Sequence, residues 1–255
     1  MATLTAMLTT AAELNHFYRV IDHETYSAIE GSDFLKSEFA AFEKRTTVRT
    51  DRTYTAIYFY GTHTYFELFD ASGEKREPGE SGIAFGVDST AAEPKAVSSE
   101  KPLTTREWQG VQMPWFYTLS AQGGQGLVAW LMEYHPDFLA KWHPNAGGPP
   151  GGITREAVLR RYRAVLRQTP ADPMLDDVAG LTVAASPEKR QPIEQWMKDI
   201  SSGFPVQFVE PGAGERGIQE ARFRLRRAPT KIVEARFGGK SVLRLRPDGT
   251  ALWTF

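Results

Sequence analysis

The hydrophobic and polar positions of this chain alternate with the two-residue period of β-strands over much of its length. Residues 14–22, LNHFYRVID, form the first such segment, and two short helical patterns follow it, with apolar residues three or four positions apart. Residues 53–70, TYTAIYFYGTHTYFELFD, then predict two strands around a turn at Gly61 and Thr62. With a polar, β-prone stretch before this hairpin, the pattern predicts a strand, a helix and three strands over residues 13–71.

A second group of strand patterns is shorter and more loosely spaced than the first. Residues 82–87 are a continuous apolar run, and residues 115–120 and 127–135 predict two further strands joined by the Gly-rich turn AQGGQG. The sequence NAGGPPGG at 145–152 is the clearest linker in the chain, because Gly and Pro interrupt both helices and strands. This second group therefore predicts a looser copy of the strand pairs in the first.

The last third of the chain repeats the opening order of elements. A strand pattern over 178–185 precedes a helix that Ser186 caps, and further strand patterns fill the remainder. This order predicts an α+β fold of repeated βαβββ modules. We expect three segments: paired modules over 13–145, a linker and a helix over 146–173, and a C-terminal βαβββ-like module over 174–255.

Composition narrows the classes of partner. The chain carries 30 basic and 31 acidic residues, and this balance gives no reason to expect binding to nucleic acid or to a membrane surface. No apolar run approaches the roughly 20 residues that span a bilayer. The first dozen residues lack the basic start of a secretory signal. We therefore expect a cytoplasmic protein, monomeric or homodimeric, that acts on a small molecule.

A few isolated polar side chains in apolar strands are the candidates for catalytic or metal-binding residues. A buried carboxylate needs a partner, and the partner of Glu67 is a cation, an arginine or a set of hydrogen-bond donors. His16 lies among apolar neighbours, either as a metal ligand or as an ordinary hydrogen-bonded histidine. Glu133 and His135 share one face of a later strand about 6.6 Å apart, so we expect only one of them, preferably Glu133, to join such a site. Because the chain has no cysteine, a metal would be held by His, Asp and Glu, which suit zinc, manganese, iron or nickel.

Several of these segments resemble strands of the vicinal oxygen chelate superfamily, which includes glyoxalase I, extradiol dioxygenases and bleomycin-resistance proteins. LNHFYRVID is similar to the first strand of that family, with His16 where the first metal ligand falls. GTHTYFELFD is similar to its fourth strand, with Glu67 in the place of the second ligand. GIAFGVD, WFYTLS and LVAWLMEYHP resemble the glyoxalase-like branch. The resemblance covers most of residues 13–145 and, more weakly, residues 174–255.

The resemblance implies curved mixed sheets that form a half-barrel pocket around a divalent metal. Neither strand that would supply the family's next ligand begins with His or Gln, so we expect Glu133 or His135 in that place. The implied function is a metal-dependent lyase or isomerase acting on a small oxygen-bearing molecule, aromatic or not, with Glu67 and Glu133 as catalytic groups. Two alternatives stay open. One is an iron-dependent ring-cleaving dioxygenase that uses His16, His135 and Glu67, and the other is a non-catalytic resistance protein that sequesters a small molecule.

Overall fold

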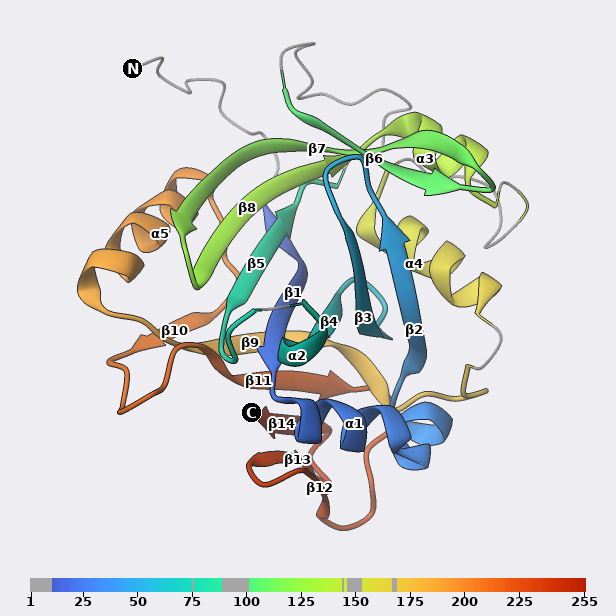
Figure 1. The fold of residues 1–255 in the computed structure, drawn as a ribbon. Coiled ribbons are helices and arrows are strands. Elements are labelled where there is room, and N and C mark those ends of the chain that lie inside the picture. Colours follow the sequence, from blue (N-terminus) through green and yellow to red (C-terminus); the bar gives the residue numbers. More distant parts are fainter. Residues whose placement is uncertain (1–10, 75, 89–100, 144, 146–152, 167–168) are drawn as a thin grey trace.

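The chain folds into a mixed α/β structure with many strands and few helices, seen in the computed structural model of Figure 1. The structure describes residues 11–74, 76–88, 101–143, 145, 153–166 and 169–255. Most of the predicted linker at 145–152 lies outside these residues. Within the described residues, the strands form two sheets (Figure 1). Buried side chains from both sheets form one shared apolar core.

The larger sheet contains eight strands of the described chain. They are β1 (Glu13–Ile21), β2 (Ala41–Val48), β3 (Thr53–Tyr60), β4 (Tyr65–Asp70), β5 (Ser81–Gly86), β6 (Leu103–Trp108), β7 (Val111–Gly124) and β8 (Leu127–Tyr134). Their order across the sheet is β2-β3-β4-β1-β5-β8-β7-β6. The sheet is mixed, because β1 runs parallel to β4 and antiparallel to β5, while β5 runs parallel to β8.

The larger sheet curves until its two edges meet, so it is nearly closed and barrel-like. An antiparallel bridge joins Arg49, just after β2, to Arg106 of β6. The sequence pattern did not predict β6, because this strand has the largely polar sequence LTTREW and leaves Leu103 exposed. Its place at the edge of the sheet explains this composition, since edge strands tolerate polar and charged side chains.

The smaller sheet contains six strands of the described chain, all from the last third of the sequence. They are β9 (Leu175–Ala184), β10 (Val206–Val209), β11 (Gly217–Leu225), β12 (Val233–Phe237), β13 (Ser241–Leu245) and β14 (Thr250–Thr254). Their order is β10-β9-β11-β14-β13-β12, and only β9 and β10 pair in parallel. A turn at Gly238 joins β12 to β13, and its φ of 59° suits glycine.

Short helices connect and cover the sheets. They are α1 (His23–Gly31), the π-helical turn η1 (Leu35–Phe39), α2 (Ala71–Glu74), α3 (Pro136–Lys141), α4 (Arg155–Val165) and α5 (Pro187–Asp199). The second of the two helical patterns after residues 14–22 is longer in the sequence than in the structure, because its apolar spacing continues to Phe42 while β2 begins at Ala41. Phe42 packs instead against Phe59 of β3, with ring centroids 5.3 Å apart. The Phe42 side chain is therefore buried by strand pairing, although its spacing in the sequence also fits the apolar face of a helix.

Each face of the larger sheet covers a separate apolar core, because strand side chains alternate between the two faces. On β3, Phe59 faces the smaller sheet, where its ring lies 5.6 Å from that of Trp253 on β14. Tyr58, the preceding residue, belongs to the core on the concave face, which α3 and α4 help to cover. The same alternation on β4 places Glu67 on the concave face, while Phe66 faces the smaller sheet.

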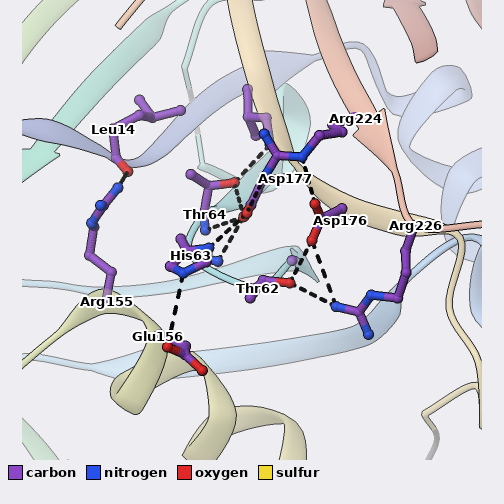
Figure 2. Close-up of polar contacts among 12 residues, drawn as sticks. Leu14, Thr62, His63, Thr64, Arg155, Glu156, Asp176, Asp177, Arg224 and Arg226 are labelled. Atoms are coloured by element: carbon purple, nitrogen blue, oxygen red, sulfur yellow. Dashed lines mark hydrogen bonds and ion pairs between the residues drawn. The ribbon is translucent and has the colours of Figure 1, made fainter. Parts of the chain in front are cut away.

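A buried carboxylate joins the two sheets at the turn between β3 and β4 (Figure 2). Asp177 of β9 accepts hydrogen bonds from the backbone N–H groups of His63 and Thr64 at 2.7 and 2.8 Å. The Thr64 hydroxyl donates to the same carboxylate at 2.9 Å. Arg224 of β11 donates to Asp177 at 3.2 Å and to Asp176 at 2.6 Å. The smaller sheet therefore holds the turn from which β4 begins.

Candidate functional site

A small pocket on the concave face of the larger sheet brings together two of the four residues that the sequence pattern selected. His16 of β1 and Glu67 of β4 line this cavity, which has a volume of about 40 Å³. The β1–β4 pairing is parallel and places His16 beside Tyr65, two residues before Glu67. Aromatic rings form most of the remaining wall, and three basic side chains also line the pocket: Arg49, Arg52 and Arg76.

His16 is held as a neutral imidazole with one ring nitrogen unprotonated. It is 6% exposed, and this burial lowers its pKa from 6.5 to about 3. The ring stacks on Tyr65 at a centroid distance of 4.4 Å. Nδ1 lies 2.8 Å from the Oδ1 of Asn15, and because an amide oxygen only accepts, Nδ1 carries the proton. Nε2 therefore presents a lone pair toward Glu67.

Glu67 is a buried acid whose protonation changes near neutral pH. Its side chain is almost fully covered, and burial is the main reason that its pKa rises from 4.5 to about 7. The charges of Arg45 and Arg52 and a hydrogen bond with Tyr65 act in the opposite direction. Oε1 lies 3.8 Å from Nε2 of His16, which is longer than a direct hydrogen bond.

Glu133 and His135 lie outside this pocket, so the expectation that Glu67 and Glu133 point into one cavity is wrong. Trp130 and Met132 of β8 line the pocket, and the two-residue period turns Glu133 to the opposite face. Glu133 is 1% exposed, neither carboxylate oxygen has a hydrogen-bond partner among the described residues, and burial raises its pKa. His135 caps α3, with Nδ1 accepting the Asp137 N–H at 3.1 Å.

The second half of the larger sheet contributes apolar side chains where a further ligand was expected. At Gly82 of β5, a Cβ atom would clash with the rings of Tyr18 and Trp130, so the rings occupy the space that a longer side chain would need. Ala84 and Met132 also belong to the concave core. No group of three or more potential His, Cys, Asp or Glu ligands occurs within the described residues.

The sequence pattern did not identify the residues that set the tautomer of His16 and that surround Glu67 with positive charge. Asn15 fixes the tautomer of His16, although strand alternation predicts that neighbouring side chains point apart. The β1–β5 register shifts between Leu14 and His16, and a bulge of this kind re-aims side chains. Arg49 and Arg52 sit after β2 in a polar stretch that had been interpreted only as an edge strand. Arg49 and Arg52 directly precede the aromatic strand β3 in the sequence, and this neighbourhood was the signal that could have placed basic side chains at the pocket.

The fold and the site together define an α/β protein with a barrel-like sheet and a small aromatic pocket that contains one His–Glu pair. The chain belongs to DUF5829, a family of unknown function, whose profile matches residues 14–255. No curated protein matches the chain. Among the described residues, no helix has the length and apolar character needed to cross a membrane.

Proposed function

We propose that this protein is a metal-dependent enzyme of the glyoxalase-like kind, a lyase or isomerase, whose site is the His16–Glu67 pocket. The observation that carries the proposal is the orientation of the pair: a neutral imidazole whose free Nε2 faces a buried carboxylate 3.8 Å away. Each group is costly to bury alone, and a divalent cation between them would satisfy both.

The strand pairing of the larger sheet supports the relationship to the vicinal oxygen chelate superfamily. In each half of the sheet the first strand runs parallel to the last, β1 to β4 and β5 to β8, and the two halves meet through the antiparallel β1–β5 pair. Two such βαβββ-type modules over residues 13–145, the second without a described helix between its first two strands, would form the half-barrel that the resemblance implies.

The chemistry of the pair suits a divalent metal. Zinc and similar ions bind imidazole nitrogen and carboxylate oxygen at about 2.0–2.2 Å, and donor atoms 3.8 Å apart can share one ion at those bond lengths. His16 and Glu67 would hold the metal, and water or substrate oxygens would complete its coordination. The Asn15 side chain would orient the imidazole, as outer-shell hydrogen bonds do in many metal sites. A bound metal would polarise a carbonyl or hydroxyl oxygen of the substrate.

The lining of the pocket favours an anionic, oxygen-bearing ligand. Arg76 lies over the Tyr18 ring at 4.8 Å, and Arg52 lies over the Tyr54 ring at 5.1 Å, so cationic groups accompany the aromatic wall. A volume of about 40 Å³ is far below the roughly 300 Å³ of a drug-sized site. We therefore propose that only the reacting, oxygen-bearing end of the substrate enters, while the arginines attract its charge.

Glu67 is the proposed proton carrier. A general acid or base works best when its pKa lies close to the working pH, and burial raises the pKa of Glu67 to about 7. That value describes the metal-free pocket. A metal ion bound beside Glu67 would lower this pKa, so in the metal-bound protein Glu67 would start as a carboxylate and act as a general base. Glu133 lies on the other face of β8 and so has no place in this proton transfer. The dioxygenase alternative also loses support, because His135 caps α3 and does not line the pocket.

A second candidate function is non-catalytic sequestration of a small anion in the same pocket. It is favoured by Gly82 and Met132, which occupy concave-face positions in the second half of the sheet without offering a ligand. A site with two protein ligands holds a metal less firmly than one with three or four. Metal retention therefore separates the two functions.

The test is metal content by elemental analysis, before and after reconstitution with zinc, manganese, iron or nickel. We expect about one ion per wild-type chain and at least tenfold weaker retention in His16→Ala and Glu67→Gln, since both remove a ligand. Glu133→Gln is the matched control, because it makes the same chemical change at a buried acid outside the pocket. Equal metal in all four proteins would contradict the assignment of ligands. A wild type that takes up no metal but still binds small anions would support sequestration.

A further inference from the structure

A second and larger cavity lies between the two sheets, away from the His16–Glu67 pocket. Its volume is about 330 Å³. The end of β1 and the start of α1 form one wall, and the segments just before β5 and β11 form another. These segments approach closely: a Cβ atom at Gly79 would lie 2.7 Å from the side chain of Arg216, and the φ of Gly79 is +91°. The absence of a side chain at Gly79 therefore lets these two segments approach and form the wall of the cavity.

The most unusual group in this cavity is Arg19 of β1. It is 8% exposed and has no carboxylate ion-pair partner among the described residues. Nη1 donates to the backbone carbonyls of Ile218 and Arg216, and Nε has no hydrogen-bond partner in the described part of the chain. The guanidinium lies 5.4 Å from the centre of the Phe255 ring. A buried charge without a counter-ion is costly, so an anion at this position would be stabilising.

The lining of the cavity carries three cations, Arg19, Arg216 and Lys240, and two acids. Arg216 also pairs with Glu77 at 3.3 Å, so Arg19 is the buried cation of this lining that lacks a carboxylate partner among the described residues. Of the two acids in the lining, Asp22 uses both carboxylate oxygens to cap α1, and Glu215 accepts a backbone N–H at 3.0 Å. Burial, with a smaller effect from Arg216, lowers the pKa of Arg19 to about 10, so it remains protonated at neutral pH.

We propose that this cavity binds a phosphate group, either as inorganic phosphate or as part of a small phosphorylated molecule. A phosphate dianion would neutralise the buried guanidinium and accept hydrogen bonds from Arg19, Arg216 and Lys240, and Arg suits this recognition because of its planar donor fork. The volume exceeds what one phosphate needs, and the Phe255 ring provides an apolar wall for an organic portion. The site is independent of the proposed metal pocket.

The test is calorimetric titration of the full chain with inorganic phosphate, compared with chloride at equal ionic strength. We expect saturable phosphate binding by the wild type and none by Arg19→Met, which keeps an unbranched apolar stem but removes the guanidinium and its charge. Lys240→Gln changes an exposed residue, so its fold should be preserved, and we expect roughly threefold weaker binding. Arg236→Gln is the matched control, because it removes an exposed cation from the same hairpin outside the cavity.

A nucleoside monophosphate titrated in the same way distinguishes the source of the phosphate. Tighter binding than inorganic phosphate would assign a phosphorylated organic ligand, and equal binding would assign free phosphate. The proposal is overturned if the wild type binds phosphate no better than chloride. It is also overturned if Lys240→Gln and Arg19→Met both bind phosphate as the wild type does. If Arg19→Met does not fold, the comparison of Lys240→Gln with Arg236→Gln decides the outcome alone.

Discussion

Replacing Glu67 by Gln should stabilise the metal-free protein at alkaline pH and leave its stability almost unchanged in acid. Burial raises the pKa of Glu67 from 4.5 to about 7. Between these values the folded state binds more protons than the unfolded state, so the free energy of unfolding falls as the pH rises through this window. The difference in pKa corresponds to about 3 kcal/mol, at about 1.36 kcal/mol per pH unit. Gln has the same size and accepts a hydrogen bond from Tyr65, but it does not ionise.

Urea unfolding of metal-free wild type and Glu67→Gln, followed at several pH values from about 4 to about 9, measures this difference. We expect the variant to exceed the wild type by almost nothing below pH 4.5 and by about 3 kcal/mol above pH 7, with the whole change inside that window. Saturating divalent metal should reverse the order, because a metal that binds only the folded wild type adds to its stability.

Glu133→Gln serves as the control for this experiment. Burial also raises the pKa of Glu133, so its replacement should stabilise the protein in the same direction at alkaline pH. Because Glu133 faces away from the pocket, this variant should keep the wild-type response to metal. A Glu67→Gln difference that stays constant across pH, or a variant less stable than the wild type at alkaline pH, would refute the reasoning about burial.

Three further predictions follow from individual contacts. Burial lowers the pKa of His16 to about 3, so the contribution of His16 to stability should be lost as the pH falls from 6.5 toward 3, and His16→Gln should gain stability relative to the wild type over that range in the same urea assay. Asp177→Asn should lower the free energy of unfolding by about 2–4 kcal/mol, because it weakens several hydrogen bonds to one carboxylate; Asp51→Asn, an exposed change, should alter it by less than about 0.5 kcal/mol. Gly82→Ala should destabilise by about 1–3 kcal/mol in thermal unfolding, since its Cβ meets Tyr18 and Trp130, and an unchanged midpoint would contradict the packing described.

Most of the local structure could be predicted from the sequence, because the period of apolar residues reflects local geometry. The hairpin at 53–70 became β3 and β4, and the strands predicted at 14–22 and 127–135 differ from β1 and β8 by only a residue or two at their ends. The errors fall where local signals are weak. They include β6, a polar edge strand, and the segment around Phe42, whose apolar spacing fits a helix as well as a strand.

The location of the site depended on more than local pattern. Alternation along β8 establishes that Glu133 and His135 share one face and that Trp130 and Met132 share the other, but it does not say which face meets the pocket. The pairing of β8 with β5 decides this, because Trp130 lies beside Ala84 of the concave core. A shift of one residue in that register would have turned Glu133 inward.

The same distinction applies to the two charged sites. The sequence by itself determined that Glu67 is an acid in an apolar strand and that its neighbours on either side face away from it. Only the tertiary structure placed His16 across the parallel β1–β4 pair, 3.8 Å from Glu67. It also buried Arg19 between two sheets whose strands lie about 200 positions apart in the chain, since Arg19 bonds to Ile218. Periodicity reports which side chains of one strand share a face, whereas contacts between distant strands depend on register and packing, which no local pattern encodes.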